Sequence, residues 1–246
     1  MADPTWSASL RDVPGSPLPT DTPESRWLGF STSGLLCGLL VIAFVLACRP
    51  AVEVGYVDDW SMARTARIFA ETGHFVYNGW AAMPEGWQIV WAAPFIKLFG
   101  FSYAVVRFSL LPVVFATIYL FWQLLRGFGL TERNASFGAV TLGLSPVFVP
   151  IASTFMTDAS GLMVLVLCLY LCQKAMAETS SKGAILWLTA AALTNIAGGT
   201  VRQTAWLGVL VMVPSVGWAL RRLRRVAAVA FSLTALSCVG IFAFLN

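Results

Sequence analysis

The chain has 246 residues, of which 58% are hydrophobic and 11% charged, and its mean hydropathy is +0.75. Soluble domains carry about 25% charged residues, so this composition excludes an ordinary soluble domain and indicates a membrane protein. The net charge of +4 comes largely from arginines at the ends of apolar segments, which are typical of topology signals and do not predict a nucleic-acid partner.

The first thirty residues hold five of the twelve prolines, mixed with Asp, Ser and Thr. Such a segment buries too little apolar surface to order itself, so we predict a disordered cytoplasmic tail over residues 1–30. It lacks the short basic start of a cleaved signal peptide. Residues 31–246 are expected to form one membrane module.

Apolar runs of about 20 residues, the length that a helix needs to cross hydrocarbon, predict seven transmembrane helices. They cover approximately residues 31–48, 103–125, 134–152, 159–177, 183–199, 203–220 and 226–245. A shorter run from Gly86 to Phe101 carries Pro94 and Lys97 and is predicted to be an interfacial or re-entrant helix. The predicted fold class is an all-α polytopic membrane protein with about seven spans and one or two interfacial helices.

The basic residues predict the orientation. If the run 86–101 does not span and the N-terminus is cytoplasmic, eight basic residues in three short loops lie inside, as the positive-inside rule requires. These residues are Arg126, Arg133, Lys174, Lys182, Arg221, Arg222, Arg224 and Arg225. Residues 49–102 then form a large first extracytoplasmic loop, and the turns at 153–158 and 200–202 face the same side.

Within this loop, the stretch "DDWSMARTARIFAETG" predicts an amphipathic helix. Its apolar stripe lies beside a charged one, so we expect the helix to lie flat on the membrane surface. The apolar stripe is Met62, Ala66 and Phe69, and the charged one is Arg64, Arg67 and Glu71. Asp58 or Asp59 is placed to cap the start of the helix, and Gly73 to end it.

The pair Asp58 and Asp59 is the first candidate site. Capping stabilises a helix by about 1 kcal/mol, and one aspartate suffices for it. The second aspartate adds like-charge repulsion unless something uses it, so the pair is a candidate for catalysis. A third acid, Asp158 in "FMTD", is either another helix cap or a member of the same extracytoplasmic site.

Several cations are candidates for phosphate binding. Arg202 and Gln203 follow Gly198 and Gly199 in a turn on the same predicted face, where a guanidinium either snorkels to lipid headgroups or binds a phosphate. Arg64, Lys97 and Arg107 are the rival candidates for a phosphate ligand. His74, Tyr77 and Trp80 form an aromatic neighbourhood that is either ordinary for an interfacial loop or a surface for a sugar ring.

The order of these elements resembles the GT-C membrane glycosyltransferases. The residues that carry the resemblance are "YVDDWSMARTARIFAETG", "HFVYNGW", "WQIVWAAPFIKLFG", "SYAVVRFSLLP" and "FMTD". The nearest likeness is to the protein O-mannosyltransferase and lipid A aminoarabinose transferase branch, and it covers roughly residues 30–245. In that family the first acid of the pair is the proposed general base, and it matches Asp58 here.

The resemblance implies an inverting transferase that moves a sugar from a polyprenyl-phosphate carrier to an extracytoplasmic acceptor, a protein or a glycolipid, in a membrane that we expect to be a bacterial plasma membrane. Asp59 stands where many members have glutamate, and Asp158 matches an acid of the second extracytoplasmic loop. No cofactor is required, although oxygen-rich sites of this kind suit Mg²⁺ or Mn²⁺.

Family members are generally about twice as long, so the chain is expected to be a fragment, a truncated copy or half of a two-chain system. Two rival functions stay open at this point. One is a non-catalytic accessory subunit completed by a partner, and the other is a flippase or transporter of a lipid-linked sugar.

Overall fold

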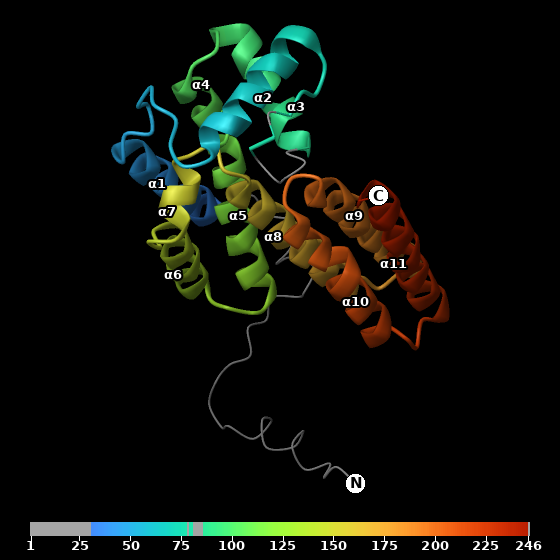
Figure 1. Cartoon of the computed structure of the whole chain (residues 1–246). Helices are drawn as coiled ribbons and strands as arrows, with labels where there is room; N and C mark the ends of the chain where they lie inside the picture. Colours follow the sequence, from blue (N-terminus) through green and yellow to red (C-terminus); the bar gives the residue numbers. More distant parts are fainter. Residues whose placement is uncertain (1–30, 78, 81–85, 246) are drawn as a thin grey trace. The chain divides into compact units, whose positions relative to one another are not determined.

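A computed structural model describes residues 31–77, 79–80 and 86–245, so the predicted tail 1–30 lies outside the described residues. The described residues form helices and no strand, in agreement with the predicted all-α class (Figure 1). The helices are α1 Thr32–Ala47, α2 Asp59–Thr72, α3 Gly86–Phe99, α4 Tyr103–Phe108, α5 Leu111–Gly127, α6 Glu132–Gly143, α7 Phe148–Ala152, α8 Thr157–Ala177, α9 Ser181–Gly199, η3 Gln203–Trp206, η4 Gly208–Met212, α10 Val213–Ala219 and α11 Arg224–Leu245.

Three of the described helices are long and apolar enough to cross a membrane. They are the run Tyr103–Gly127 formed by α4 and α5, then α8 and α11, with mean hydropathies of 2.0, 1.7 and 2.2. Helix α1 and the run Gln203–Ala219 are apolar but shorter. The seven predicted apolar runs all contain helix, and three of them meet the length and hydropathy of a span.

The predicted span 134–152 is wrong as a continuous helix. The chain forms α6 and α7 there, and it breaks between them at Ser145 and Pro146. Pro146 has no N–H to give to the preceding turn, and its ring clashes with a helical carbonyl. The Ser145 hydroxyl then accepts the N–H of Phe148 at 3.1 Å, at the start of α7.

The predicted span 203–220 is helical but irregular. It opens as the 3₁₀ helix η3, passes through the π-helix η4 and ends as the α-helix α10. Pro214 lies at the start of α10 and removes one i→i−4 hydrogen bond, which explains why the ladder changes its register at this point.

Helix α2 is amphipathic as predicted, and Gly73 ends it with a left-handed φ of 74° and an N–H bonded to Phe69 O at 2.8 Å. Its apolar stripe packs against protein, and the expectation that it lies flat on the bilayer stays a prediction. Met62 and Ala66 are buried against α3 and α4. On the opposite side, Arg67 pairs with Glu71 at 2.7 Å and both stay exposed.

The predicted short helix of the first loop is α3. Its 14 residues would measure about 21 Å, too short for the hydrocarbon core of about 30 Å. Figure 1 shows α2, α3 and α4 together beyond one end of α5. Phe155, from the turn before α8, is fully buried in the cluster that these helices form.

We expect this cluster to hold the first loop in place. Ile89 on α3 is fully buried in it, so Ile89→Ala should lower the free energy of unfolding by about 2–5 kcal/mol. Leu98 on the same helix is 77% exposed, so Leu98→Ala is the matched control and should change little. Thermal unfolding of the purified full-length protein measures both. Equal melting temperatures for the two variants would contradict this packing.

Candidate functional site

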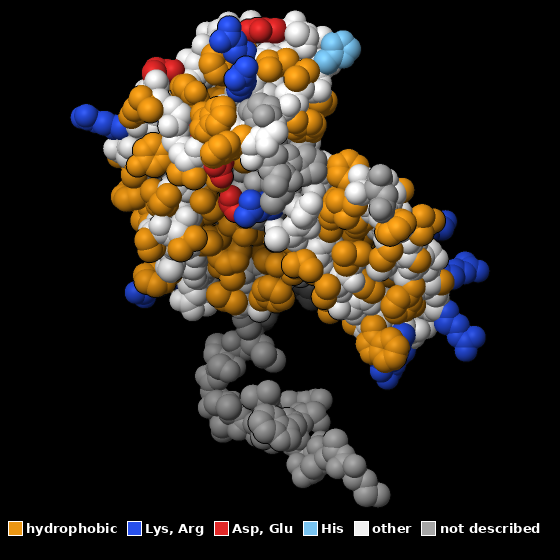
Figure 2. All heavy atoms as spheres, viewed as in Figure 1, with side chains coloured by type: hydrophobic (Ala, Val, Ile, Leu, Met, Phe, Trp, Pro, Cys, Tyr) orange, Lys and Arg blue, Asp and Glu red, His pale blue; other side chains and the backbone are white. Residues whose placement is uncertain are grey.

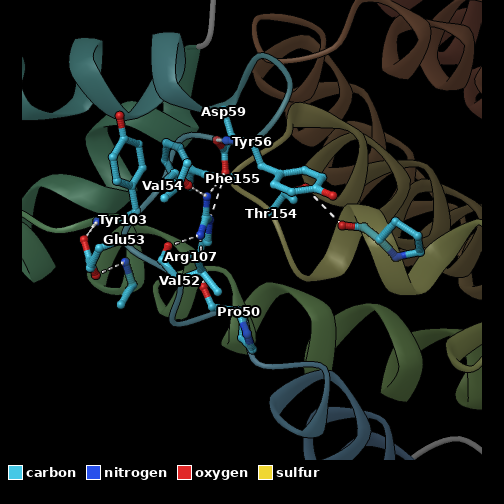
Figure 3. A network of polar contacts seen from close by, with 12 residues as sticks. Pro50, Val52, Glu53, Val54, Tyr56, Asp59, Tyr103, Arg107, Thr154 and Phe155 are labelled. Carbon is cyan, nitrogen blue, oxygen red and sulfur yellow. Dashed lines mark hydrogen bonds and ion pairs between the residues drawn. The ribbon is translucent and has the colours of Figure 1, made fainter.

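The site begins with a buried ion pair between α2 and α4. The Asp59 carboxylate is fully buried, and its Oδ2 lies 2.8 Å from Nη2 and 2.9 Å from Nε of Arg107, which is 4% exposed (Figure 3). The other oxygen, Oδ1, accepts the backbone N–H of Tyr56 at 2.5 Å. An ion pair taken out of water is tolerated only when its remaining polar atoms are bonded, and here they are.

The loop before α2 supplies the rest of those bonds. Arg107 Nη1 donates to the carbonyls of Pro50 and Val52 at 3.1 and 2.6 Å, and Nη2 donates to Val54 O at 2.7 Å. These three carbonyls belong to alternate residues of the loop. The five N–H donors of the guanidinium are thus all engaged by protein oxygens.

Glu53, in the same loop, caps α4. Its two oxygens accept the N–H groups of Tyr103 and Ala104 at 2.9 and 3.1 Å, while Ser102 Oγ accepts the N–H of Val105 at 3.1 Å. The first three orphan donors of α4 are therefore bonded. The loop 49–57 is thus bonded to α4 at both ends. Glu53 of the loop caps the first turn of α4, and Arg107 in its last turn donates to the loop carbonyls.

Two residues with positive φ mark the ends of this loop. Arg49 has φ of 56° and Val57 has φ of 50°. A left-handed conformation is strained for a residue other than glycine, most of all for a β-branched one such as Val57. Strain of this kind persists only where the surroundings determine it, and here the Arg107 and Glu53 contacts do so.

Asp58, next to the buried Asp59, is half-buried and has a different environment. Its Oδ1 accepts the indole N–H of Trp80 at 2.9 Å, and the rings of Trp80 and Trp60 lie 5.7 Å apart. The predicted side-chain cap is absent: Asp58 occupies the N-cap position without such a bond, and Asp59 reaches back to Tyr56. The adjacent acids therefore point to different partners, one inside the fold and one at its surface.

The third predicted acid is paired with the predicted arginine. Asp158 Oδ1 lies 2.8 Å from Arg202 Nη2, and their side chains are 29% and 30% exposed. Arg202 Nη1 also lies 3.5 Å from Thr157 Oγ1, and its aliphatic stem packs over Gly161. A half-exposed pair contributes about 0–1 kcal/mol to stability, so its main structural effect is to fix the direction of the guanidinium.

Helix α3 connects the loops that carry these groups. The Gln88 amide donates to Phe155 O at 3.2 Å, three residues before Asp158. The start of α3 packs closely on Thr200, because a Cβ at Gly86 would lie 2.0 Å from its hydroxyl. Helix α2 also packs on α3. Three segments therefore contact the cluster formed by α2, α3 and α4: the start of α2 after Asp58, the turn before Asp158 and the turn before Arg202.

The remaining predicted residues are placed less favourably. His74 is exposed beyond the C-terminus of α2, about 20 Å along the helix from Asp58, and Tyr77 stacks on Phe75 near that end at 6.2 Å. Lys97 is exposed in the last turn of α3, where a cation complements the helix dipole. Gln203 is exposed at the start of η3.

Two predicted roles do not fit this geometry. Arg107 has no N–H left for a phosphate, so it belongs to the fold and not to donor binding. Asp59 is fully buried with both oxygens bonded, so it is not placed to act as a catalytic base. Within the described part of the chain, no group of three or more His, Cys, Asp or Glu side chains is arranged to hold a metal ion.

Some contributing residues were missed by sequence reasoning. Trp60 directly follows the acidic pair, and a Trp at that place was a readable signal for an aromatic wall. Glu53 and Thr157 had no such signal, because their partners lie 50 and 45 residues away along the chain.

We expect the shape of the Arg107 guanidinium to matter as much as its charge. Lys carries three donors on one point charge and cannot bond the oxygens that Arg107 reaches. Arg107→Lys should therefore lower the free energy of unfolding by about 3–5 kcal/mol, the cost of a broken buried pair. Arg64→Lys, at an exposed position of α2, is the control. A melting temperature of Arg107→Lys equal to that of the wild type would overturn this assignment.

The chain matches no protein-family model, and comparisons with curated proteins and with solved structures find no match. The resemblance to GT-C enzymes therefore rests on the short motifs quoted above and on their order.

Proposed function

We propose that the protein is a multi-pass membrane glycosyltransferase with a polyprenyl-phosphate-linked sugar as its donor and an extracytoplasmic hydroxyl as its acceptor. The observation that carries the proposal is the pair of half-exposed charged groups, Asp58 with Trp80 and Arg202 with Asp158, on loops that pack around α3. One group offers a carboxylate and the other a guanidinium, the two functions that such a transfer needs.

Asp58 is the proposed general base. The indole N–H of Trp80 orients its carboxylate, and Trp60 and Trp80 provide an aromatic wall on which a sugar ring can pack. In the reaction, the acceptor hydroxyl gives its proton to Asp58 while its oxygen bonds to the anomeric carbon. The bond from that carbon to the phosphate oxygen breaks on the opposite side, so the configuration inverts.

Arg202 is the proposed phosphate ligand. The electron pair of the breaking bond moves onto the prenyl phosphate, and a guanidinium aimed at that oxygen stabilises the developing charge. Asp158 holds one edge of the guanidinium at 2.8 Å, and the 30% exposed remainder is what a phosphate would contact. Arg107 lends support to this arrangement only through the fold, by holding the start of α2.

The proposed orientation, with a cytoplasmic N-terminus, puts the proposed site on the side where the donor is used. A cytoplasmic N-terminus puts the start of α2, the start of α8 and the turn after α9 on the extracytoplasmic side, where lipid-linked sugars with large carriers are used. The arginine-rich turn between α10 and α11 then lies inside, as positive-inside topology expects. No metal is needed for the displacement as written.

Asp58→Asn should lower turnover by at least about a hundredfold with the protein still folded, since a positioned base contributes about 10²–10⁴-fold. The assay follows release of undecaprenyl phosphate from undecaprenyl-phosphate mannose and from the aminoarabinose analogue by the full-length protein in nanodiscs. Glu71→Gln, an exposed carboxylate on the same helix, is the matched control and should stay within about twofold. Unchanged turnover in Asp58→Asn would leave the accessory-subunit function as the better account.

Arg202→Gln should lower kcat/KM for the donor more than Arg64→Gln does. The second variant removes an exposed arginine from α2. We expect kcat/KM for the lipid-phosphate donor to fall about ten- to a hundredfold, because a charge-assisted contact to phosphate contributes about 1.5–3 kcal/mol. The measurement is donor saturation at fixed acceptor. An equal, small loss in both arginine variants would remove Arg202 from the site.

A further inference from the structure

The turn between α10 and α11 concentrates positive charge at one place on the surface. Four arginines occupy five consecutive positions there, and all are exposed: Arg221, Arg222, Arg224 and Arg225. No Asp or Glu follows Glu178 in the sequence. Within the described residues, the ion pairs lie elsewhere, between Arg67 and Glu71, Asp59 and Arg107, and Asp158 and Arg202.

Helix stabilisation does not explain this cluster. Two of the arginines, Arg224 and Arg225, open α11, where the helix dipole disfavours cations. Glu178, the last acid of the sequence, lies in the connection between α8 and α9 and is engaged locally, because it accepts the N–H groups of Thr179 and Ser180 at 3.2 and 3.3 Å. The charge of the four arginines is therefore left for a ligand or for solvent.

A shallow, mainly apolar groove ends at Trp218, three residues before the first arginine of the cluster. It has a volume of about 400 Å³ and lies along η4 and α10, lined by Leu210, Val211, Pro214, Ser215 and Trp218. The Ser215 hydroxyl donates to Val211 O at 2.6 Å, so it is turned to its own helix, and the groove is lined mainly by apolar atoms. Its length from residue 210 to 218 is about 12 Å, most of the hydrocarbon depth of one leaflet.

Trp218 joins the groove to the arginines. Its ring is 64% exposed in the last turn of α10, and the Arg221 guanidinium lies over it, 5.2 Å from the ring centroid. Arg221 also donates to Trp218 O at 3.2 Å. Figure 2 shows Lys and Arg side chains gathered at this end of α10 and α11 beside apolar ones. A tryptophan between apolar and charged surface is typical of a membrane interface.

We propose that this turn binds an anionic phospholipid, with the phosphate among the four arginines and one acyl chain along the groove. Guanidinium groups bind phosphate through paired N–H bonds, and basic clusters beside a membrane helix favour lipids with a net negative charge. A topology signal needs only the charge, whereas a lipid site also needs the groove and the aromatic that connects it. This site is independent of the proposed transfer reaction.

The test uses the fluorescence of Trp218 in the full-length protein, taken as the difference between the wild type and Trp218→Phe. Nanodiscs of phosphatidylcholine contain a minor fraction of either acyl-brominated phosphatidylglycerol or acyl-brominated phosphatidylcholine, whose bromines quench a nearby indole. We expect quenching of Trp218 to be at least about fivefold stronger with the anionic lipid, and the preference to vanish at about 1 M salt. Equal quenching by the two lipids in the wild type would overturn the proposal.

Variants separate the site from a general charge effect. Arg222→Gln with Arg225→Gln should abolish the preference, while Arg133→Gln with Lys182→Gln removes the same charge from other loops and should retain it. Ser215→Phe fills the groove and should reduce quenching with the arginines intact. If both charge-removing pairs lose the preference equally, or if Ser215→Phe quenches like the wild type, the lipid site is contradicted.

Discussion

The fold of the first loop depends on one buried guanidinium. The charge of Arg107 is buried in the protein. The cost of removing it from water is offset because Asp59 neutralises it and three carbonyls of the loop 49–57 complete its hydrogen bonds. The constraint acts in both directions. It fixes the loop in a conformation with positive φ at both ends, and it fixes the start of α2 against the last turn of α4.

This arrangement explains why two aspartates stand side by side. Asp59 is the counter-ion of the buried cation, so its charge belongs to the fold. Asp58, at the N-cap position before α2, is only half-buried and meets Trp80 instead. The rigidity given by Asp59 is what would let Asp58 hold a fixed direction toward a substrate.

The sequence predicts the parts of this structure that depend on local patterns. The apolar stripe of α2, its end at Gly73 and the short helix α3 follow from residue spacing and from glycine's access to positive φ. The break at Pro146 was readable in the same way but was outweighed by the length of the apolar run.

The pairings across the chain were not predictable from one sequence. Asp59 and Arg107 are 48 residues apart and Asp158 and Arg202 are 44 apart, so no local rule links them. From the sequence alone, a charged residue of a membrane protein fits a role in orientation, helix capping or catalysis, and only its burial distinguishes these roles. Burial is what separates Arg107, with all its donors bonded, from Arg202, which keeps an exposed edge.

The most direct test of this account compares Asp58→Asn with Asp59→Asn in the same membranes, with thermal unfolding and donor turnover measured on each. The account predicts that the first variant melts like the wild type and has lost turnover, whereas the second has lost thermal stability. A stable Asp59→Asn protein, or an active Asp58→Asn protein, would contradict the division of roles between the two acids.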